Sequence, residues 1–419
     1  MRTSTGRVAR IHACAARCCA IALLLVVSAC GGGGNEADTA AAAAAGTQAS
    51  DANGSTVNAA ALADNEVKIT VDGGTQGNSV NSPFVEVTVC APGGADCETI
   101  DHVLLDTGSY GLRIVAGALG SRLSALPPVK ARDGKALAEC AGFVSGYTWG
   151  SVRTADVRIA NETARDLPIQ VVNDPGAAAV PDECSSTGAD LGASLGAKAI
   201  LGVGFKTQDC GVDCVEATAP GLYFSCSGTA CASTTVPLAS QVTNPVARFP
   251  VHNNGVVIRL PGVAPGGVDS LAGTLVLGVG TAPNNQVGVE QVFTANEQGN
   301  FTTVYRGRTM RGFLDSGSNG IFFRDRSIPS CSSGFYCPTR PLTLTASVRG
   351  ADGKGSRSVD FLVESAAALP DSVAAAHLGG DFGTAAYFDW GLPFFFGRTV
   401  FVALSGASTP FGTGPFWAF

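Results

Sequence analysis

The sequence predicts an all-β protein, and two observations lead to this prediction. Apolar and polar residues alternate with the period of a half-buried strand in several short runs, most clearly at residues 84–89 and 155–160. Clusters of Gly, Asn, Asp and Pro recur between such runs and indicate turns, as at residues 72–74. Only two weak helical patches interrupt the pattern, at residues 238–244 and 366–378.

The composition allows a large folded core and argues against a nucleic-acid partner. At roughly 100–200 residues per domain, 419 residues suit two domains or one two-lobed body. Hydrophobic residues make up 45% of the chain and charged residues 15%, which excludes wholesale disorder. Positions 1–29 hold four arginines and no acid, so the remaining chain has 23 basic and 34 acidic residues, a net charge of −11. Nucleic-acid binding needs concentrated Lys and Arg, which this balance does not supply.

Residues 1–29 predict a lipoprotein signal peptide. Positively charged residues precede an apolar run at 20–27 that is too short to cross a bilayer. The run leads through Val, Ser and Ala into Cys30, which resembles the lipobox of bacterial lipoproteins, where the cysteine becomes the lipidated N-terminus. A plain secretory signal and an uncleaved membrane anchor are the alternatives.

The stretch that follows predicts a flexible tether. Residues 30–65 are rich in Gly and Ala, and such a composition cannot bury a core. We therefore expect a folded body held by lipid on the periplasmic side of the bacterial cell envelope, at the outer membrane.

The cysteines of the remaining chain predict disulfides. Ten are left after the signal peptide and Cys30 are set aside, an even number in a chain expected to be exported. Four pairs are close neighbours that flank turn residues, and elimination leaves the last two for each other. The predicted pairs are Cys90–Cys97, Cys210–Cys214, Cys226–Cys231, Cys331–Cys337 and Cys140–Cys184. Zinc at residues 210–214 is the alternative, but that site lacks a second CxxC or a His pair, so we expect no metal.

One internal repeat carries the candidate chemistry. Residues 102–114 and 311–323 each contain an apolar strand, then Asp-(Thr/Ser)-Gly-Ser, a short turn ending in Gly, and a second apolar strand. Asp106 is followed 96 residues later by Gly202, which closes an apolar run, and Asp315 is followed 82 residues later by Gly397, which closes another. This recurrence indicates that one lobe has been duplicated.

The paired motifs resemble those of the pepsin-like aspartic proteases, and the resemblance extends over most of the chain from residue 66. It implies a two-lobed fold with a central cleft, with lobes at residues 66–245 and 246–419. The chain as a whole also resembles a bacterial group of exported lipoproteins of uncharacterised function. In the aspartic proteases a flap tyrosine closes over the cleft, and Tyr147 is the candidate here, although the surrounding stretch departs from the family pattern.

Elementary chemistry supports a catalytic role for the two aspartates. Two carboxyls within hydrogen-bond reach cannot both ionise readily, so they share one proton. The ionised carboxyl can accept a proton from water while the protonated one polarises a peptide carbonyl, without metal or cofactor. Hydroxyl donors should favour the ionised form, which predicts lowered pKa values and an acidic optimum. The predicted catalytic residues are Asp106 and Asp315, supported by Thr107, Gly108, Ser109, Ser316, Gly317 and Ser318.

Two functions from different classes follow from this reading. The first is a lipid-anchored, monomeric aspartic endopeptidase that takes a peptide or protein substrate in the cleft between its lobes. The second is a catalytically silent protein of the same fold that serves as a binding module of the cell envelope. The retained pair of repelling carboxylates favours the enzyme, whereas the shortened flap favours the binding module. A single Asp-x-Gly-Ser is more often only a turn between strands, so the hypothesis depends on the pair.

Overall fold

The computed structural model describes residues 61–94, 96–218, 221–370 and 373–419. Residues 61–419 form one unit of mutual contacts. The predicted signal peptide, Cys30 and most of the predicted tether lie outside the described residues. Strands dominate the described part, and its α-helices have four residues each, so the fold is all-β as predicted. None of its helices is long and apolar enough to span a membrane.

Most strands belong to a sixteen-stranded sheet with the order β11-β10-β5-β6-β7-β4-β9-β3-β2-β1-β13-β12-β22-β25-β14, with β8 paired to β6. Its strands from the first half are β1 (Glu66–Val71), β2 (Pro83–Cys90), β3 (Cys97–Asp106), β4 (Tyr110–Val115), β5 (Ala136–Phe143), β6 (Gly146–Ile159), β7 (Glu162–Val172), β8 (Ala189–Asp190), β9 (Ala199–Val203), β10 (Tyr223–Ser227) and β11 (Ala230–Ser233). Those from the second half are β12 (Gly255–Leu260), β13 (Leu271–Leu277), β14 (Val292–Thr294), β22 (Arg398–Ala403) and β25 (Phe416–Ala418). An additional pairing of β6 with β2 closes part of the first half into a barrel.

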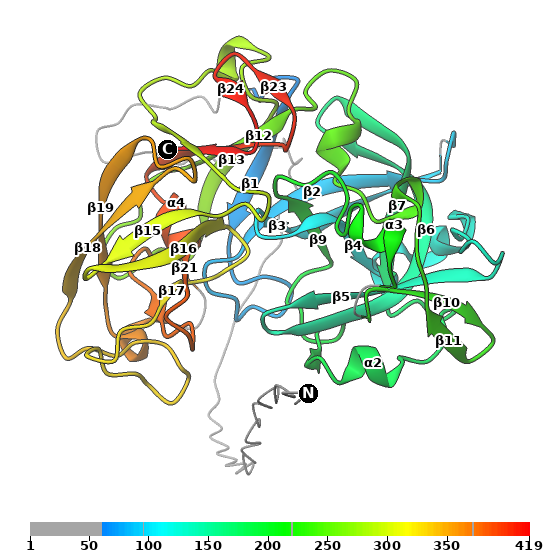
Figure 1. Cartoon of the computed structure of the whole chain (residues 1–419), viewed down its shortest axis with the longest axis horizontal. Coiled ribbons are helices and arrows are strands. Elements are labelled where there is room, and N and C mark those ends of the chain that lie inside the picture. Colours follow the sequence, from blue (N-terminus) through cyan, green and yellow to red (C-terminus); the bar gives the residue numbers. More distant parts are fainter. Residues whose placement is uncertain (1–60, 95, 219–220, 371–372) are drawn as a thin grey trace, which may run out of the picture. The chain divides into compact units, whose positions relative to one another are not determined.

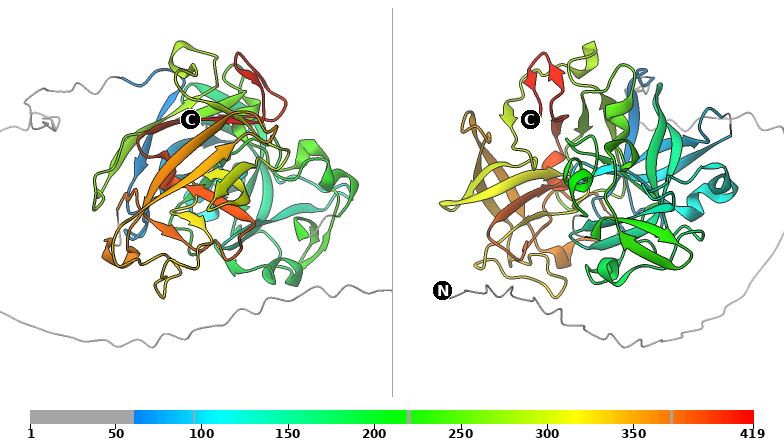
Figure 2. Two further views of the ribbon diagram at one scale, coloured as in Figure 1. Left: turned by 60° about the vertical axis from the view of Figure 1, so that its left-hand side comes forward. Right: turned by 45° about the vertical axis from the view of Figure 1, so that its right-hand side comes forward.

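A second sheet of seven strands forms the rest of the second half, in the order β19-β18-β15-β16-β21-β17-β20. Its strands are β15 (Phe301–Tyr305), β16 (Arg308–Asp315), β17 (Ile321–Phe323), β18 (Leu342–Arg349), β19 (Ser356–Val363), β20 (Gly379–Gly380) and β21 (Tyr387–Gly391). A separate hairpin joins β23 (Ser408–Thr409) to β24 (Gly412–Thr413). Figure 1 shows the seven-stranded sheet on the left, β4–β7 and β9–β11 on the right, and β1, β12 and β13 between them, and the turned views in Figure 2 agree.

The first strand of the fold ties the two halves together. β1 pairs antiparallel with β13 over six residue pairs and with β2 on its other side, so one sheet crosses from the first half into the second. The predicted division into lobes at residues 245/246 stays a prediction, because this sheet crosses it.

Helices are short and connect strands. The α-helices are α1 (Ala116–Leu119), α2 (Asp182–Ser185), α3 (Asp213–Glu216) and α4 (Leu392–Phe395), and the described 3-10 turns are η1 (Gly120–Ala125), η3 (Leu238–Ser240), η4 (Pro245–Arg248), η5 (Pro283–Asn285) and η6 (Ala366–Ala368). Of the two helical patches expected from sequence, only the single turns η3 and η6 are helical among the described residues. At 241 the chain becomes extended because the buried Gln241 side chain bonds the backbone of Gly211 in both directions. Local helix propensity is often overridden by tertiary contacts of this kind.

All five predicted disulfides are present in the structure, with Cα–Cα separations from 4.0 to 5.8 Å. The two shortest, 4.0 and 4.1 Å, join residues that face each other directly across a hairpin, where strands approach most closely. The sulfur atoms of Cys210 and Cys214 are joined in a disulfide, so they are not available as zinc ligands.

Candidate active site

The two sequence motifs occupy equivalent places in the two halves. Asp106 is the last residue of β3, which runs parallel to β9, and β4 returns antiparallel on the other side of β9. Asp315 is the last residue of β16, which runs parallel to β21, and β17 returns antiparallel on the other side of β21. Leu105 and Leu314, directly before the two aspartates, are 0% and 1% exposed, so the core holds both loops in place.

Each aspartate pairs with a glycine of the neighbouring strand, and in the second half this glycine is not the one that the sequence predicted. Asp106 pairs with Gly202, as expected, but Asp315 pairs with Gly391 rather than with a strand ending at Gly397. A Cβ at Gly202 would lie 2.5 Å from the backbone N of Tyr110, and a Cβ at Gly391 would lie 2.6 Å from the backbone O of Ser318. Each loop therefore crosses its neighbouring strand so closely that only glycine fits.

Reciprocal hydrogen bonds join the two loops at their second residues. The Thr107 hydroxyl donates to the Leu314 carbonyl at 3.0 Å and accepts from the Ser316 N–H at 2.9 Å. The Ser316 hydroxyl donates to the Leu105 carbonyl at 2.7 Å and accepts from the Thr107 N–H at 3.1 Å. Both side chains are buried, at 1% and 0% exposure. The relative position of the two aspartates is thus determined by buried contacts between the halves.

The carboxyl groups meet at the centre of this arrangement. A Cβ at Gly108 would lie 2.6 Å from Cγ of Asp315, and a Cβ at Gly317 would lie 2.8 Å from Cγ of Asp106. Each carboxyl therefore contacts the glycine of the opposite loop, and the two carboxyls are within hydrogen-bond reach of each other. Glycine is required at both positions because any side chain would displace a carboxylate.

Hydrogen-bond donors from its own loop hold each carboxyl. Asp106 accepts from the Gly108 N–H at 2.7 Å and from the Ser109 hydroxyl. Asp315 accepts from the N–H groups of Gly317 and Ser318 at 2.8 and 3.2 Å, and from the Ser318 hydroxyl at 2.9 Å. The predicted supporting residues therefore all lie at the pair.

The pKa of Asp315 moves in the direction opposite to our expectation. Burial, the negative charge of Asp106 and a hydrogen bond with Asp106 raise it to about 8, and the donors Ser318 and Gly317 only partly oppose this rise. The free-energy cost of removing an ionised carboxyl from water is larger than the stabilisation that the hydrogen bonds from two neutral donors give it. A proton is therefore retained at the pair from acidic to neutral pH.

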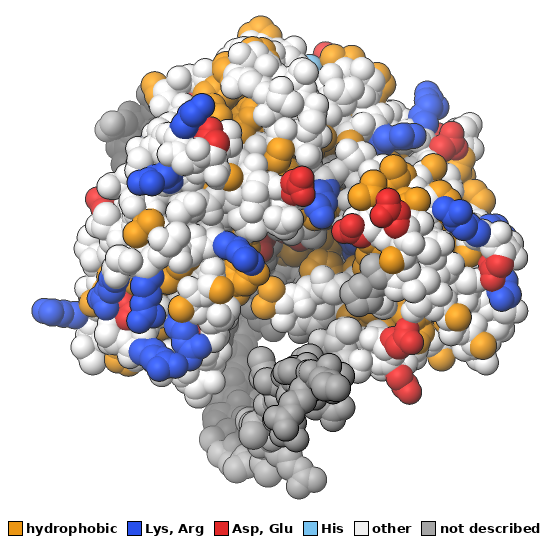
Figure 3. Space-filling model, viewed as in Figure 1, with side chains coloured by type: hydrophobic (Ala, Val, Ile, Leu, Met, Phe, Trp, Pro, Cys, Tyr) orange, Lys and Arg blue, Asp and Glu red, His pale blue; other side chains and the backbone are white. Residues whose placement is uncertain are grey.

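A cavity of about 660 Å³ lies beside Asp315 and the loop that follows Asp106, and residues of both halves line it. Its walls include Gly108, Tyr110, Val144, Phe205, Phe313 and Asp315. Figure 3 shows this face of the molecule hollowed near its centre. A substrate in the cavity would thus contact Asp315, the loop of Asp106 at Gly108, and several apolar and aromatic side chains together.

Comparison with protein families assigns the chain directly. The family described as "Protein of unknown function (DUF3443)" matches residues 61–419, which is the whole folded body. The chain belongs to this family. No curated protein matches the sequence. Among solved structures it is similar to the crystal structure of an aspartic proteinase from Irpex lacteus, with a TM-score of 0.47 and 17% identity over 84% of this chain and 96% of that one.

Tyr147 does not occupy the position expected of a flap tyrosine. It is 5% exposed and packs with Cys140, Trp149, Cys184 and Phe224 in a small core under the β5–β6 hairpin. The hairpin instead presents Val144 at its tip, and Val144 lines the cavity over the aspartates. The flap prediction is therefore wrong for Tyr147, because its side chain points into the hairpin's own core.

Tyr110 is a site residue that the sequence reasoning missed. It lines the cavity, and its ring makes an edge contact with Phe205 at a centroid distance of 5.2 Å. Burial, followed by the negative charges of Asp106 and Asp315, raises the pKa of Tyr110. Its position directly after the first Asp-Thr-Gly-Ser was a signal that could have identified it.

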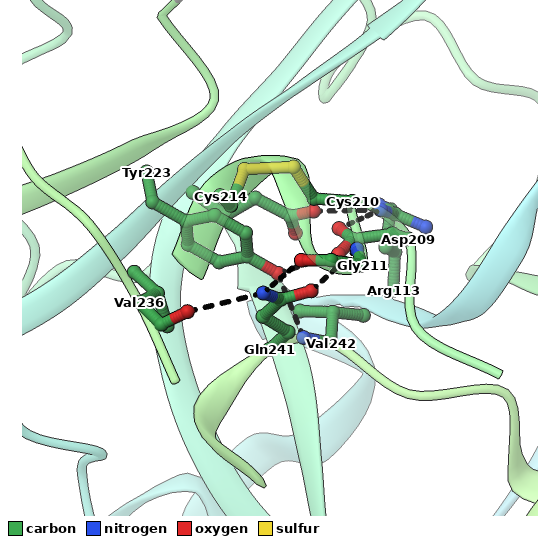
Figure 4. The surroundings of a disulfide bond; sticks show 10 residues. Arg113, Asp209, Cys210, Gly211, Cys214, Tyr223, Val236, Gln241 and Val242 are labelled. Atoms are coloured by element: carbon green, nitrogen blue, oxygen red, sulfur yellow. Dashed lines mark hydrogen bonds and ion pairs between the residues drawn. A yellow bond between two sulfur atoms is a disulfide. The ribbon is translucent and has the colours of Figure 1, made fainter. Parts of the chain in front are cut away.

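A buried charged cluster lies next to the Asp106 loop. Arg113 donates to Glu139 at 2.6 Å and to Asp209 at 3.0 Å, and the Tyr223 hydroxyl donates to Asp209 at 2.7 Å. Figure 4 shows Arg113, Asp209 and Tyr223 beside the Cys210–Cys214 disulfide. Arg113 and Asp209 also line a recess of about 160 Å³ that reaches Ser109. The first half thus has a charged side chain, Arg113, at the register position that Phe322 holds in the second half.

Proposed function

We propose that this protein is an aspartic endopeptidase that hydrolyses peptide bonds with a water molecule activated by Asp106 and Asp315. The observation that carries the proposal is the carboxyl pair itself, placed within hydrogen-bond reach by two loops that are locked together through Thr107 and Ser316. A structural role alone does not account for two carboxyls held against each other, because their repulsion destabilises the fold.

The raised pKa of Asp315 supports one division of roles between the two aspartates. Asp315 holds the shared proton and donates it to the carbonyl oxygen of the scissile bond, while Asp106 accepts a proton from the attacking water. The new C–O bond produces a tetrahedral diol. Asp106 then gives its proton to the leaving nitrogen as the C–N bond breaks, and Asp315 recovers a proton from the diol hydroxyl. Both carboxyls return to their starting state without a covalent intermediate.

The cavity walls suggest the kind of peptide that fits. Val144 and Phe205 on one side and Phe313 and Trp417 on the other offer apolar surface near the carboxyls. We therefore propose substrates with apolar side chains flanking the scissile bond, since burial of such side chains supplies binding free energy.

The location of the enzyme is proposed from the sequence of residues 1–30. The charged start, the short apolar run and Cys30 support lipid attachment on the periplasmic side of the envelope. Replacing Cys30 with Ser should release soluble protein or leave the precursor unprocessed. Unchanged membrane fractionation of this variant would contradict lipid anchoring.

The experiment that tests the activity uses a peptide library and the full chain from about pH 3 to pH 8, the range that a shared-proton pair can cover. Wild type should cleave, and Asp106→Asn and Asp315→Asn should each abolish cleavage, because an amide cannot accept the proton from water. Asp360→Asn is the matched control, since Asp360 is an exposed strand residue whose carboxylate accepts a hydrogen bond from the Thr345 hydroxyl. Cleavage that survives both substitutions would place any activity elsewhere.

A binding module is the second candidate, and the hairpin favours it. Tyr147 is buried, and the exposed tip residue Val144 offers no hydrogen-bonding side chain to a substrate. If wild type cleaves no peptide but binds peptides, and Phe313→Ala weakens that binding, the protein is a catalytically silent binding module and not an endopeptidase.

A further inference from the structure

Another cavity, which we call the arginine cavity, lies in the second half of the fold at the tip of the β15–β16 hairpin. Its volume is about 500 Å³, and it shares no lining residue with the cavity beside Asp315. Among the described residues, its walls include the guanidinium groups of Arg306, Arg308, Arg324 and Arg326 and the carboxylate of Asp325. Figure 3 shows Lys and Arg side chains gathered at the lower left of this face, where Figure 1 places the seven-stranded sheet.

This concentration of positive charge differs from the rest of the chain and from the other half of the fold. Residues 30–419 carry a net charge of −11. Counted from the two aspartates, Arg324 and Arg326 correspond to Val115 and Gly117 of the first half. The β2–β3 hairpin, which corresponds to β15–β16, turns through residues 91–96 without Lys or Arg. Duplication of one lobe therefore does not account for the arginines.

The carboxylate in the cavity wall balances one of the four positive charges. Asp325 is 8% exposed, and its Oδ2 lies 3.0 Å from Arg306 Nη1. Oδ2 also accepts from the Tyr305 hydroxyl at 2.7 Å, and Oδ1 accepts from the Ser327 N–H and hydroxyl at 2.9 and 2.7 Å. Both oxygens are thus occupied by Arg306 and neutral donors.

The other arginines leave positive charge unbalanced. Arg308 and Arg326 are exposed and form no salt bridge with any described residue. Arg324 Nη1 donates to the Gly383 carbonyl, and its Nε lies 3.9 Å from Asp381 Oδ2. At least two positive charges around the cavity therefore lack an acidic partner in the described part of the chain. Like charges held close together repel, and a bound anion removes this repulsion.

The hairpin places Arg306 at the cavity although the backbone there favours other residues. Arg306 and Gly307 form the two-residue turn between β15 and β16, and their φ angles are 48° and 74°. Turns of this kind favour Asn, Asp or Gly, because a side chain beyond Cβ is strained at positive φ. The hydrogen bonds of Arg306 to described residues use Nη1, so three N–H groups on Nε and Nη2 remain to donate to a ligand.

We propose that the arginine cavity is a binding site for a phosphate group, carried by a free phosphate compound or by an anionic lipid headgroup. A phosphate monoester has a charge of about −1.5 to −2 at pH 7, which matches the unbalanced positive charge, and its three oxygens can accept from several guanidiniums. A carboxylate has one negative charge and two oxygens, which a single guanidinium can satisfy. The site goes beyond the proposed hydrolysis, because none of its residues lines the cavity beside Asp315.

Calorimetric titration of the full chain with inorganic phosphate at pH 7 tests the site with a free ligand. Wild type should bind phosphate, and Arg308→Gln and Arg326→Gln should each weaken binding about tenfold, the factor for one lost hydrogen bond between charged groups. Both side chains are exposed, so the variants should keep the fold. Arg349→Gln is the matched control, because Arg349 is exposed on β18 near the other end of β15, opposite Thr302, and does not line the cavity. It should bind phosphate as wild type does.

Vesicle flotation tests the lipid headgroup. All proteins in this assay carry Cys30→Ser, so that lipid attached to Cys30 cannot hold them on every vesicle. Vesicles of phosphatidylcholine with phosphatidic acid should capture the chain, and vesicles of phosphatidylcholine alone measure binding that does not depend on the phosphate monoester. The double variant Arg308→Gln, Arg326→Gln should lose the capture that depends on phosphatidic acid, and Arg349→Gln should keep it.

The two probes also identify the source of the phosphate group. Binding of inorganic phosphate without capture by phosphatidic acid supports the site and identifies a free phosphate compound as its ligand. Capture by phosphatidic acid that requires Arg308 and Arg326 supports the site and identifies a lipid headgroup, with or without binding of inorganic phosphate. The proposal is overturned if wild type binds neither probe, or if the arginine-cavity variants bind both probes as tightly as Arg349→Gln.

Discussion

Replacing Thr107 with Val should destabilise the fold by several kcal/mol, although the change only replaces one hydroxyl group with a methyl group. The Thr107 hydroxyl satisfies two buried backbone groups of the opposite loop, the Leu314 carbonyl and the Ser316 N–H. Valine has nearly the same shape but leaves both groups without a partner. Each unsatisfied buried group costs about 1–3 kcal/mol, so the expected loss is about 2–6 kcal/mol.

The assay is urea unfolding of the full chain at pH 5 with disulfides intact, and Thr107→Ser is the matched control. Serine keeps the hydroxyl and removes one buried methyl group, worth about 0.8 kcal/mol. A double-mutant cycle with Ser316→Ala should show a coupling of about 0.5–3 kcal/mol, because both side chains belong to one network. If Thr107→Val and Thr107→Ser unfold within about 0.5 kcal/mol of each other, a difference typical of surface changes, the reasoning about the loops is refuted.

Further predictions concern pH and the disulfides. Because the pKa of Asp315 is raised to about 8, the singly protonated pair should persist up to that pH, and kcat/KM measured from about pH 4 to 10 should fall above it. The native protein keeps a proton at Asp315 that the unfolded chain releases near pH 3.8, so wild-type stability should decline as the pH rises toward about 8. Asp315→Asn lacks this decline. In urea unfolding it should therefore be more stable than wild type at pH 8 but not at pH 3. The double variant Cys140→Ala, Cys184→Ala removes a disulfide that closes a loop of 44 residues and should lower the free energy of unfolding by about 4 kcal/mol. Cys210→Ala with Cys214→Ala removes one that spans 4 residues and should lower it by about 2 kcal/mol, because a shorter loop restricts the unfolded chain less. The reverse order in thermal unfolding would contradict this argument.

The repeat made the centre of the site predictable from sequence. Asp106 and Asp315 lie at the ends of equivalent strands because the same strand, turn and strand pattern occurs twice. The disulfides were predictable for a different reason, since four of the five pairs are separated by no more than seven residues. Short separations leave few alternatives for pairing.

The features that could not be predicted depend on tertiary contacts. The pairing of Asp315 with Gly391 was not predicted because Asp389 interrupts the apolar run before Gly391, whereas Gly397 follows an uninterrupted apolar run. Tyr147 and Val144 are three residues apart on one hairpin, and the β6 residue pairings, which sequence does not specify, decide which of them is buried. The direction of the Asp315 pKa shift followed from burial, which the motif alone does not reveal.

The place of β1 in the large sheet has a consequence for the order in which the chain can fold. β1 ends at residue 71 and its partner β13 begins at residue 271, so synthesis of some 200 residues separates them. At about 5–20 residues per second, the ribosome needs roughly 10–40 s to supply the missing partner. During that time β1 can pair with β2 only, and its other side exposes unpaired backbone groups of the kind that promote aggregation. A chain stopped at residue 245 would keep that edge open permanently, so the first half should aggregate when it is produced alone and stay soluble when residues 246–419 are supplied with it.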